Sequence, residues 1–404
     1  MITLRPFRAW RPAADKAHLV GSRTYVSYSA EQLAEKLAGN PYSFLHVLRP
    51  EEEDGSLSRG DRFHRVRKAF QRFCEDRVLE RDPFPSLYIY EQTSRGNSSR
   101  GIIAGVSVED YRAGRIKVHE QTLIAKENLF AEYLGSTGVN AEPVLLATPE
   151  GLAWEAILDP LVNDRPSFDF STTDRVRHRL WPIVDERVRQ SLQRSFAEMP
   201  ALYIADGHHR LASSARLSES RNCTDVDAAA WCLAFIVPRS QLYIYNFDRA
   251  ITTLGALSEA EFLEALSGVG RLEPVVAPWS APGAIAVRTG AGWHVLHLPP
   301  PPPSHAPADR LDAARLSELV LGPLLGIDDL RTDRRAQFIP GVEGTSELDR
   351  RVQHGEAAVA FHLYPVAFTD LKAVADSGGT MPPKSTYVEP KLRSGLTIYS
   401  LDDV

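Results

Sequence analysis

The chain has 404 residues, 43% of them hydrophobic and 24% charged, with a formal net charge of −6 at pH 7. This composition is typical of a globular protein of two or three domains, and its acidic balance argues against broad nucleic-acid binding, which needs clustered cations. The cysteines Cys74, Cys223 and Cys232 fit neither a zinc site nor a disulfide framework, and no apolar run of about 18 residues occurs, so we expect a cytoplasmic protein without a membrane span or signal peptide.

The N-terminal half is expected to alternate short helices and strands. Phe63, Val66, Phe70 and Phe73 recur at helical spacing, which predicts an amphipathic helix at 62–80 with its arginines on a solvated face. A charged, glycine-containing stretch at 51–60 predicts a loop. Further helices are expected at 31–38 and 126–134, and strands at 44–48, 87–90, 101–108, 144–147 and 152–158.

The C-terminal half continues the alternation, which predicts an α/β or mixed α+β fold. Helices are expected at 181–197, 311–325, 347–353 and 367–375, and strands at 202–205, 231–237 and 357–363. Five consecutive prolines at 299–303 indicate either a stiff linker between domains or a loop inserted within one domain. With a boundary at these prolines and another between residues 98 and 99, the chain divides into an N-terminal segment 1–98, a core 99–298 and a C-terminal segment 304–404.

The sequence from Leu202 to Arg210 is the strongest local signal in the chain. An apolar run, Leu202 to Ala205, leads directly into Asp206-Gly207-His208-His209-Arg210, and a helix-forming stretch follows. This order predicts a buried strand, a glycine turn and a helix, whose N-terminus suits a phosphate or carboxylate. Asp206 either positions magnesium, directly or through water, or caps the helix. The two histidines point about 100° apart on a helix, so we do not expect them to chelate one zinc ion.

The five residues Asp206 to Arg210 resemble the signature turn of the ParB/sulfiredoxin-type superfamily, which includes partition proteins, sulfiredoxins and free-serine kinases. In that superfamily a strand ending in a His-Glu pair precedes the turn, and Val118-His119-Glu120 matches it. The tail at 381–391, containing Pro-Pro-Lys-Ser-Thr, resembles the C-terminal signature of a bacterial family long described as uncharacterised, some of whose members resemble ATP-dependent free-serine kinases. Arg5-Pro6-Phe7 and the stretch 40–47 match that family too. The resemblance implies a ParB/sulfiredoxin-like, nucleotide-binding core with additional N- and C-terminal elements.

The function that this resemblance implies is transfer of a phosphoryl group from ATP or ADP, with Mg²⁺, to the hydroxyl of free L-serine or a close analogue. By resemblance Glu120 is the general base and Asp206 the second catalytic and magnesium-binding residue, and the nucleotide is held by Gly207, His208, His209 and Arg210. Substrate- or phosphate-binding candidates are His119, Lys384, Ser385, Thr386, Lys391 and Arg5.

Several alternatives stay open. The family carries an acid near its N-terminus where this chain has Tyr25-Val26-Ser27, so the acceptor is not fixed. The nucleotide is ATP, ADP or CTP, and the oligomeric state is undetermined. A sulfiredoxin is excluded because the turn has no cysteine. A nucleotide-triggered clamp or regulator of the ParB type, and a nuclease, are the rival functions; the acidic net charge argues against both.

Overall fold

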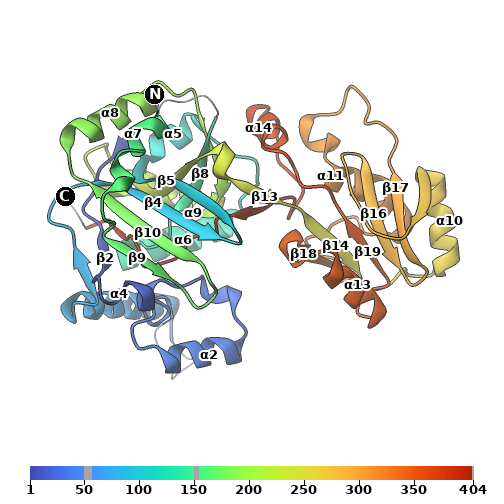
Figure 1. Cartoon of the computed structure of the whole chain (residues 1–404), viewed down its shortest axis with the longest axis horizontal. Coiled ribbons are helices and arrows are strands. Elements are labelled where there is room, and N and C mark those ends of the chain that lie inside the picture. The colour runs from blue at the N-terminus through green and yellow to red at the C-terminus, as the bar shows by residue number, and fades with distance from the viewer. Residues whose placement is uncertain (50–56, 150–153, 403–404) are drawn as a thin grey trace. The chain divides into compact units, whose positions relative to one another are not determined.

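The computed structural model describes residues 1–49, 57–149 and 154–402, which form two compact units of mixed α/β structure (Figure 1). Unit 1 comprises Met1–Lys117, Thr122–Leu242 and Pro390–Val404; unit 2 comprises Val118–Gln121 and Tyr243–Glu389. The proline run at 299–303 lies inside unit 2. The two units therefore divide the chain at other positions than the three segments predicted from the sequence. Among the described residues, no helix combines the length and the apolar character that a membrane crossing requires.

Unit 1 is built on a mixed sheet with the strand order β6-β11-β8-β12-β5-β4-β10-β9, and β1 pairs with β5. Neighbours are antiparallel except β6 with β11 and β8 with β12. The central strand β12 is buried along its whole length, as its apolar sequence predicts. The strands are β1 (Leu4–Arg5), β4 (Leu87–Ser94), β5 (Asn97–Ser107), β6 (Ile116–Lys117), β8 (Val144–Thr148), β9 (Phe168–Ser171), β10 (Arg177–Ile183), β11 (Leu202–Asp206) and β12 (Trp231–Pro238), with the separate pairs β2 (Trp10–Pro12) with β3 (Leu79–Arg81) and β7 (Val139–Asn140) with β21 (Tyr399–Ser400).

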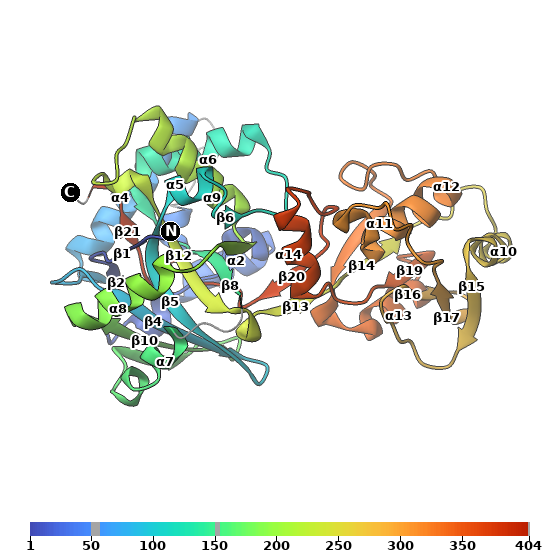
Figure 2. The same ribbon diagram turned by 90° about the horizontal axis from the view of Figure 1, so that it is seen from above.

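Two helices of unit 1, α6 (Ile124–Thr137) and α9 (His208–Ser220), lie side by side (Figure 2). Ala131 and Leu134 of α6 pack against Leu217 of α9. The other helices are α1 (Ala17–Val20), α2 (Ala30–Gly39), α3 (Leu45–Leu48), α4 (Arg59–Glu75), α5 (Val108–Arg112), α7 (Trp154–Leu158) and α8 (Glu186–Ala197), with the 3₁₀ turns η1 (Tyr25–Ser27), η2 (Leu161–Asn163), η3 (Ala228–Ala230) and η4 (Arg239–Gln241).

Helix α4 forms as the apolar spacing predicts, although it ends at Glu75 rather than at residue 80. The Ser58 side chain caps it by accepting a hydrogen bond from the backbone N–H of Asp61. Val66, Phe70 and Phe73 are buried in one cluster with Phe44 and Val47 of the α3 region. Each such burial contributes about 1.5–3 kcal/mol, which is enough to fix this helix in unit 1.

Two predicted strands of unit 1 are helical, so these predictions were wrong. Residues 45–48 form α3, one turn whose Leu45 and Val47 are both buried. Residues 154–158 form α7, with Trp154 and Leu158 buried at a helical spacing of four. Short apolar runs do not distinguish a buried strand from a buried helical turn, and tertiary packing decides.

Two other predicted segments were placed differently. The predicted helix at 181–197 begins as strand β10, which ends at Ile183, and becomes α8 after the N-cap Asp185. The predicted loop at 51–60 lies partly outside the described residues, as does the start of the strand predicted at 152–158.

Unit 2 contains a sheet of order β15-β17-β16-β19-β14-β18 and the pair β13-β20. Its core packs Phe262 and Leu266 against Ile285, Leu316 and Phe361. The helix predicted at 311–325 consists of α11 (Asp312–Leu316), the π-helical turn η6 (Ser317–Leu321) and α12 (Gly322–Leu325) in succession. The remaining elements are β13 (Tyr243–Tyr245), β14 (Phe247–Ile251), α10 (Glu259–Val269), β15 (Arg271–Val275), β16 (Ala284–Thr289), β17 (Gly292–His297), η5 (Pro307–Arg310), β18 (Ala336–Pro340), η7 (Gly341–Glu343), α13 (Thr345–Gln353), β19 (Val359–His362), α14 (Phe368–Asp376) and β20 (Tyr387–Glu389).

Candidate functional site

The predicted strand, glycine turn and helix are present in unit 1. Strand β11 ends at Asp206, Gly207 takes the left-handed conformation (φ 99°), and α9 begins at His208. The pairing of β11 with β8 is irregular between Ile204 and Asp206, which changes the direction of the strand end. A Cβ atom on residue 207 would lie 2.8 Å from Nε and Nη2 of Arg210. Glycine is therefore required here both for the backbone angle and for the close approach of the guanidinium group.

Four charged side chains and one hydroxyl form a network at this turn. The Arg210 guanidinium donates through Nη2 to Asp206 Oδ2 at 2.8 Å and through Nη1 to Glu142 Oε1. Lys391 Nζ donates to Asp206 Oδ1 at 3.2 Å, and Ser394 Oγ donates to Glu142 Oε2 at 3.2 Å. Two residues of the C-terminal segment thus complete a site that begins at β11.

The network keeps Asp206 ionised. Burial favours the neutral acid and would raise the pKa of Asp206, but the charges of Lys391 and Arg210 outweigh it and hold the pKa well below its ordinary value. Burial would likewise lower the pKa of Arg210, but Glu142 and Asp206 raise it. The Asp206 side chain is 41% exposed, so a charged carboxylate remains accessible to a ligand beside two cations.

The two histidines at the start of α9 differ in their surroundings. His208 is buried. His209 accepts a hydrogen bond through Nε2 from the backbone N–H of Leu123, 3.3 Å away, just before α6. His209 thus links the beginnings of α9 and α6, and contact of either histidine with a nucleotide stays a prediction.

The remaining predicted site residues lie in three places. Arg5, in β1 of unit 1, donates to the carbonyl oxygens of Val226 and Asp227, both at 3.2 Å, and its guanidinium lies over the Trp231 ring. His119 and Glu120 belong to unit 2, where the His119 carbonyl accepts from the backbone N–H of Met381 at 2.8 Å. Their segment follows β6, which ends at Lys117, rather than ending the strand as expected.

Lys384, Ser385 and Thr386 lie in a loop of unit 2 that is held in a defined conformation. Lys384 has a positive φ of 54°, which is unfavourable for a side chain of its kind. The fully buried Arg249 donates through Nη2 to the carbonyl oxygens of Pro383 and Lys384, at 3.3 and 3.0 Å, and burial lowers the pKa of Arg249 to about 10. Ser385 Oγ donates to the Pro382 carbonyl at 2.8 Å. The structure thus brings Asp206, Gly207, Arg210 and Lys391 together in unit 1, and the Pro-Pro-Lys-Ser-Thr loop belongs to unit 2.

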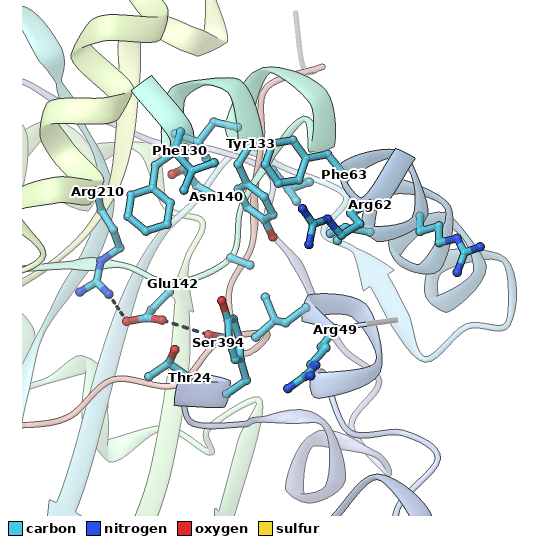
Figure 3. A pocket seen from close by; sticks show the side chains of 18 of the residues that line it. Thr24, Arg49, Arg62, Phe63, Phe130, Tyr133, Asn140, Glu142, Arg210 and Ser394 are labelled. Carbon is cyan, nitrogen blue, oxygen red and sulfur yellow. Dashed lines mark hydrogen bonds and ion pairs between the residues drawn. The ribbon is translucent and has the colours of Figure 1, made fainter. Parts of the chain in front are cut away.

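A cavity of about 710 Å³ opens beside the turn, wholly within unit 1 (Figure 3). The Arg210–Glu142–Ser394 chain lies at one end, and Arg49 and Arg62 lie at the other. Between them are aromatic rings from α4 and α6, those of Phe63, Phe130 and Tyr133. The Phe63 and Tyr133 rings meet edge to face with centroids 5.3 Å apart.

Sequence reasoning missed several residues of this region. Glu142, Ser394 and Asn140 belong to no recognised motif, and they reach the site through long-range contacts that local pattern does not reveal. The α4 arginines carried a usable signal: Arg59, Arg62 and Arg65 repeat every three residues beside Phe63, which places cations and a ring on adjacent faces of one helix. The prediction placed the arginines of the helix at 62–80 on a solvated face; Arg62 is exposed as expected, and it also lines the cavity.

Comparison with known proteins gives a family and distant structural likenesses. Residues 4–314 match the family model described as "Protein of unknown function (DUF1015)". Solved structures that resemble the chain include SbnI with a C-terminal truncation from Staphylococcus aureus (13% identity, 75% of this chain and 90% of that chain, TM-score 0.41). They also include a free serine kinase in complex with AMP (14% identity, 73% of this chain and 91% of that chain, TM-score 0.37). Its E30A mutant in complex with ADP is similar to the same extent (14% identity, 73% of this chain and 92% of that chain, TM-score 0.37). No curated protein matches.

Proposed function

We propose that this chain, which belongs to the DUF1015 family, is a nucleotide-dependent phosphotransferase that transfers a phosphoryl group, from ATP in the first instance, to the hydroxyl of free L-serine or a close analogue. Its unit 1 would correspond to the nucleotide-binding core of the ParB/sulfiredoxin-type superfamily, on the resemblance of its signature turn.

The observation that carries the proposal is the charge network at the start of α9. Phosphoryl transfer depends on positioning and charge stabilisation more than on covalent help from the protein. The first N–H groups of α9 and the Lys391 ammonium supply positive potential at one place. The Nη donors of Arg210 are engaged by Asp206 and Glu142, so a phosphate at the turn would compete with these carboxylates for them.

Magnesium belongs to this proposal as the ion that would accompany the nucleotide phosphates and spread their charge. Asp206 is the residue that would hold it, directly or through water, because its carboxylate stays ionised and partly exposed. Both oxygens of Asp206 have cationic partners, so the ion would displace Lys391 from Oδ1. Lys391 would then contact a phosphate in place of Asp206 Oδ1.

Glu120 is the proposed general base for the acceptor hydroxyl. Its assignment rests on the Val118-His119-Glu120 resemblance, and a carboxylate is a suitable acceptor for that proton. In the same proposal, Lys384 and the hydroxyls of Ser385 and Thr386 contact the acceptor, and the defined backbone of their loop, held by Arg249, supports that role.

The test is incubation of the protein with Mg²⁺ and ATP, ADP or CTP in turn, against L-serine, L-threonine and L-homoserine, followed by ³¹P NMR. We expect a phosphomonoester with L-serine from at least one nucleotide. Lys391→Ala should reduce the rate by about 10²-fold, in the range seen when a preorganised charge at a reaction centre is removed. Lys372→Ala, which removes an exposed lysine of α14, serves as the control and should leave the rate unchanged. No phosphomonoester with any pair would refute the proposal.

A further inference from the structure

The cavity of unit 1 contains a buried hydrogen-bonding atom that the protein does not satisfy. Asn140, at the end of β7, lines the cavity and is 5% exposed. Its Nδ2 is buried, with no hydrogen-bond partner among residues 1–49, 57–149 and 154–402. Buried polar side chains are nearly always paired, so an orphaned donor on a residue that lines a cavity marks a position for a ligand acceptor. The Nε of Arg210, at one end of the same cavity, is buried and unpartnered within the described residues in the same way.

The cavity also has an excess of positive charge at the end formed by α4. Arg49, Arg59, Arg62 and Arg65 all line it. Arg59 is paired with Glu132 at 3.3 Å, but the Arg62 guanidinium has no partner in the described part of the chain. Among the described residues that line the cavity Glu142 is the acid, and Arg210 and Ser394 already engage both of its oxygens.

A third property is the aromatic wall. The Phe130 side chain is 41% exposed although it is large and apolar, and it faces the cavity beside Tyr133 and Phe63 (Figure 3). Exposed rings next to arginines are the usual surroundings of a planar ring that stacks while an attached anion binds the guanidinium groups.

We infer that this cavity is a binding site for a nucleoside phosphate. The base lies against Phe130 and Tyr133, Asn140 Nδ2 donates to an acceptor of the base or sugar, and the phosphate contacts Arg62 and its neighbours on α4. The volume of about 710 Å³ suits a ligand of this size, whereas an inorganic anion would leave most of it empty.

This site is distinct from the phosphate position proposed at the turn, because the anion lies at α4, at the opposite end of the cavity from Arg210 (Figure 3). The inference therefore does not rest on the proposed phosphoryl transfer. The occupant would be a second ligand, present whether or not the turn holds a phosphoryl donor.

The experiment is calorimetric titration of the whole chain with ADP, GDP, CDP, adenosine and inorganic pyrophosphate. We expect at least one nucleoside diphosphate to bind at least about tenfold more tightly than adenosine or pyrophosphate, because ring and phosphate contribute together. The inference would be overturned if pyrophosphate bound as tightly as every nucleotide. It would also be overturned if no nucleotide bound at millimolar concentration.

Matched variants locate the binding. Arg62→Gln combined with Arg65→Gln should weaken the nucleotide at least about tenfold through loss of charge-assisted hydrogen bonds. Arg72→Gln, an exposed arginine of the same helix that does not line the cavity, should have no effect. Equal affinities in these two proteins would overturn the inference.

Variants of the ring wall and of the amide test the base. Phe130→Ala should weaken the nucleotide by about fivefold or more, whereas Ile124→Ala, an exposed control on α6, should not. Asn140→Leu should weaken the binding of the nucleotide but not that of pyrophosphate. Because Asn140 is buried, the melting temperature of this variant is measured as well. Phe130 is exposed, so Phe130→Ala should fold and tests the position of the base even if Asn140→Leu does not fold. Should phosphoryl transfer be absent while nucleotide binding depends on Arg62 and Phe130, the proposed function fails and this site stands.

Discussion

Removing Arg210 should destabilise unit 1 by an amount that follows from its surroundings. Its side chain is 28% exposed and that of Glu142 24%. Exposed ion pairs contribute about 0.2–1 kcal/mol, and breaking a fully buried pair costs about 3–5 kcal/mol, so this pair lies between them. Asp206 keeps Lys391 as a partner, which limits the loss on that side. For Arg210→Ala we expect about 2 kcal/mol, which lowers the melting temperature by about 4–8 °C in a unit of this size.

A double-mutant cycle separates the ion pair from other effects of truncation. Scanning calorimetry of wild type, Arg210→Ala, Glu142→Ala and the double variant should give a coupling energy of about 1 kcal/mol. The pair Arg177–Asp169 of β10 and β9, whose side chains are 50% and 37% exposed, serves as the comparison and should couple more weakly. A coupling below about 0.3 kcal/mol, the size of ordinary additivity error, would show that the network contributes little and would refute this reasoning.

Three further changes have distinct expected outcomes. Glu120→Gln should lower turnover by at least about 10²-fold with nucleotide affinity nearly unchanged, since the amide cannot accept a proton; turnover near wild type would remove Glu120 as the base. Gly207→Ala should lower the free energy of unfolding by more than about 1 kcal/mol, measured in thermal melts, because φ is 99° and the new Cβ would lie 2.8 Å from two nitrogens of Arg210; a melting temperature equal to that of wild type would contradict this. Burial would raise the pKa of Asp174, but Arg393 and other donors outweigh it and lower the pKa to about 2. A depressed pKa stabilises the fold above the unfolded value, so Asp174→Asn should be less stable than wild type at pH 7, and this difference should shrink as pH falls from about 4 to 2 in thermal melts; a difference that persists unchanged at pH 2 would contradict it.

Local pattern predicted those elements whose sequence and packing agree. The strand, turn and helix at 202–220 formed as expected, because the apolar run, the glycine and the helix-forming residues all favour one structure. The mixed α/β class was predicted on the same basis. Residues 45–48 were placed in a strand because an apolar tetrapeptide fits a strand and a helical turn equally well, and packing against α4 selected the turn.

The site was only partly predictable, for a physical reason. Asp206, Gly207 and Arg210 are adjacent in sequence, and Lys391 was identified by resemblance. Glu142 lies 68 residues before its partner Arg210, and Ser394 lies 252 residues after its partner Glu142. The sequence around Glu142 and Ser394 contains no motif that predicts these contacts. Glu142 is one acid among many, and only its position beside Arg210 distinguishes it.

Because the chain returns to unit 1 at Pro390, unit 1 cannot finish folding until nearly the whole protein has been synthesised. During synthesis, a ribosome must translate all of 243–389 before Lys391 can reach Asp206, Ser394 can reach Glu142 and β21 can pair with β7. Until then the nascent unit 1 has an aspartate without its lysine and a strand without its partner. A transcript that stops before codon 390 would therefore yield a chain with the signature turn but without a completed site, and such products should be targets for cellular proteases.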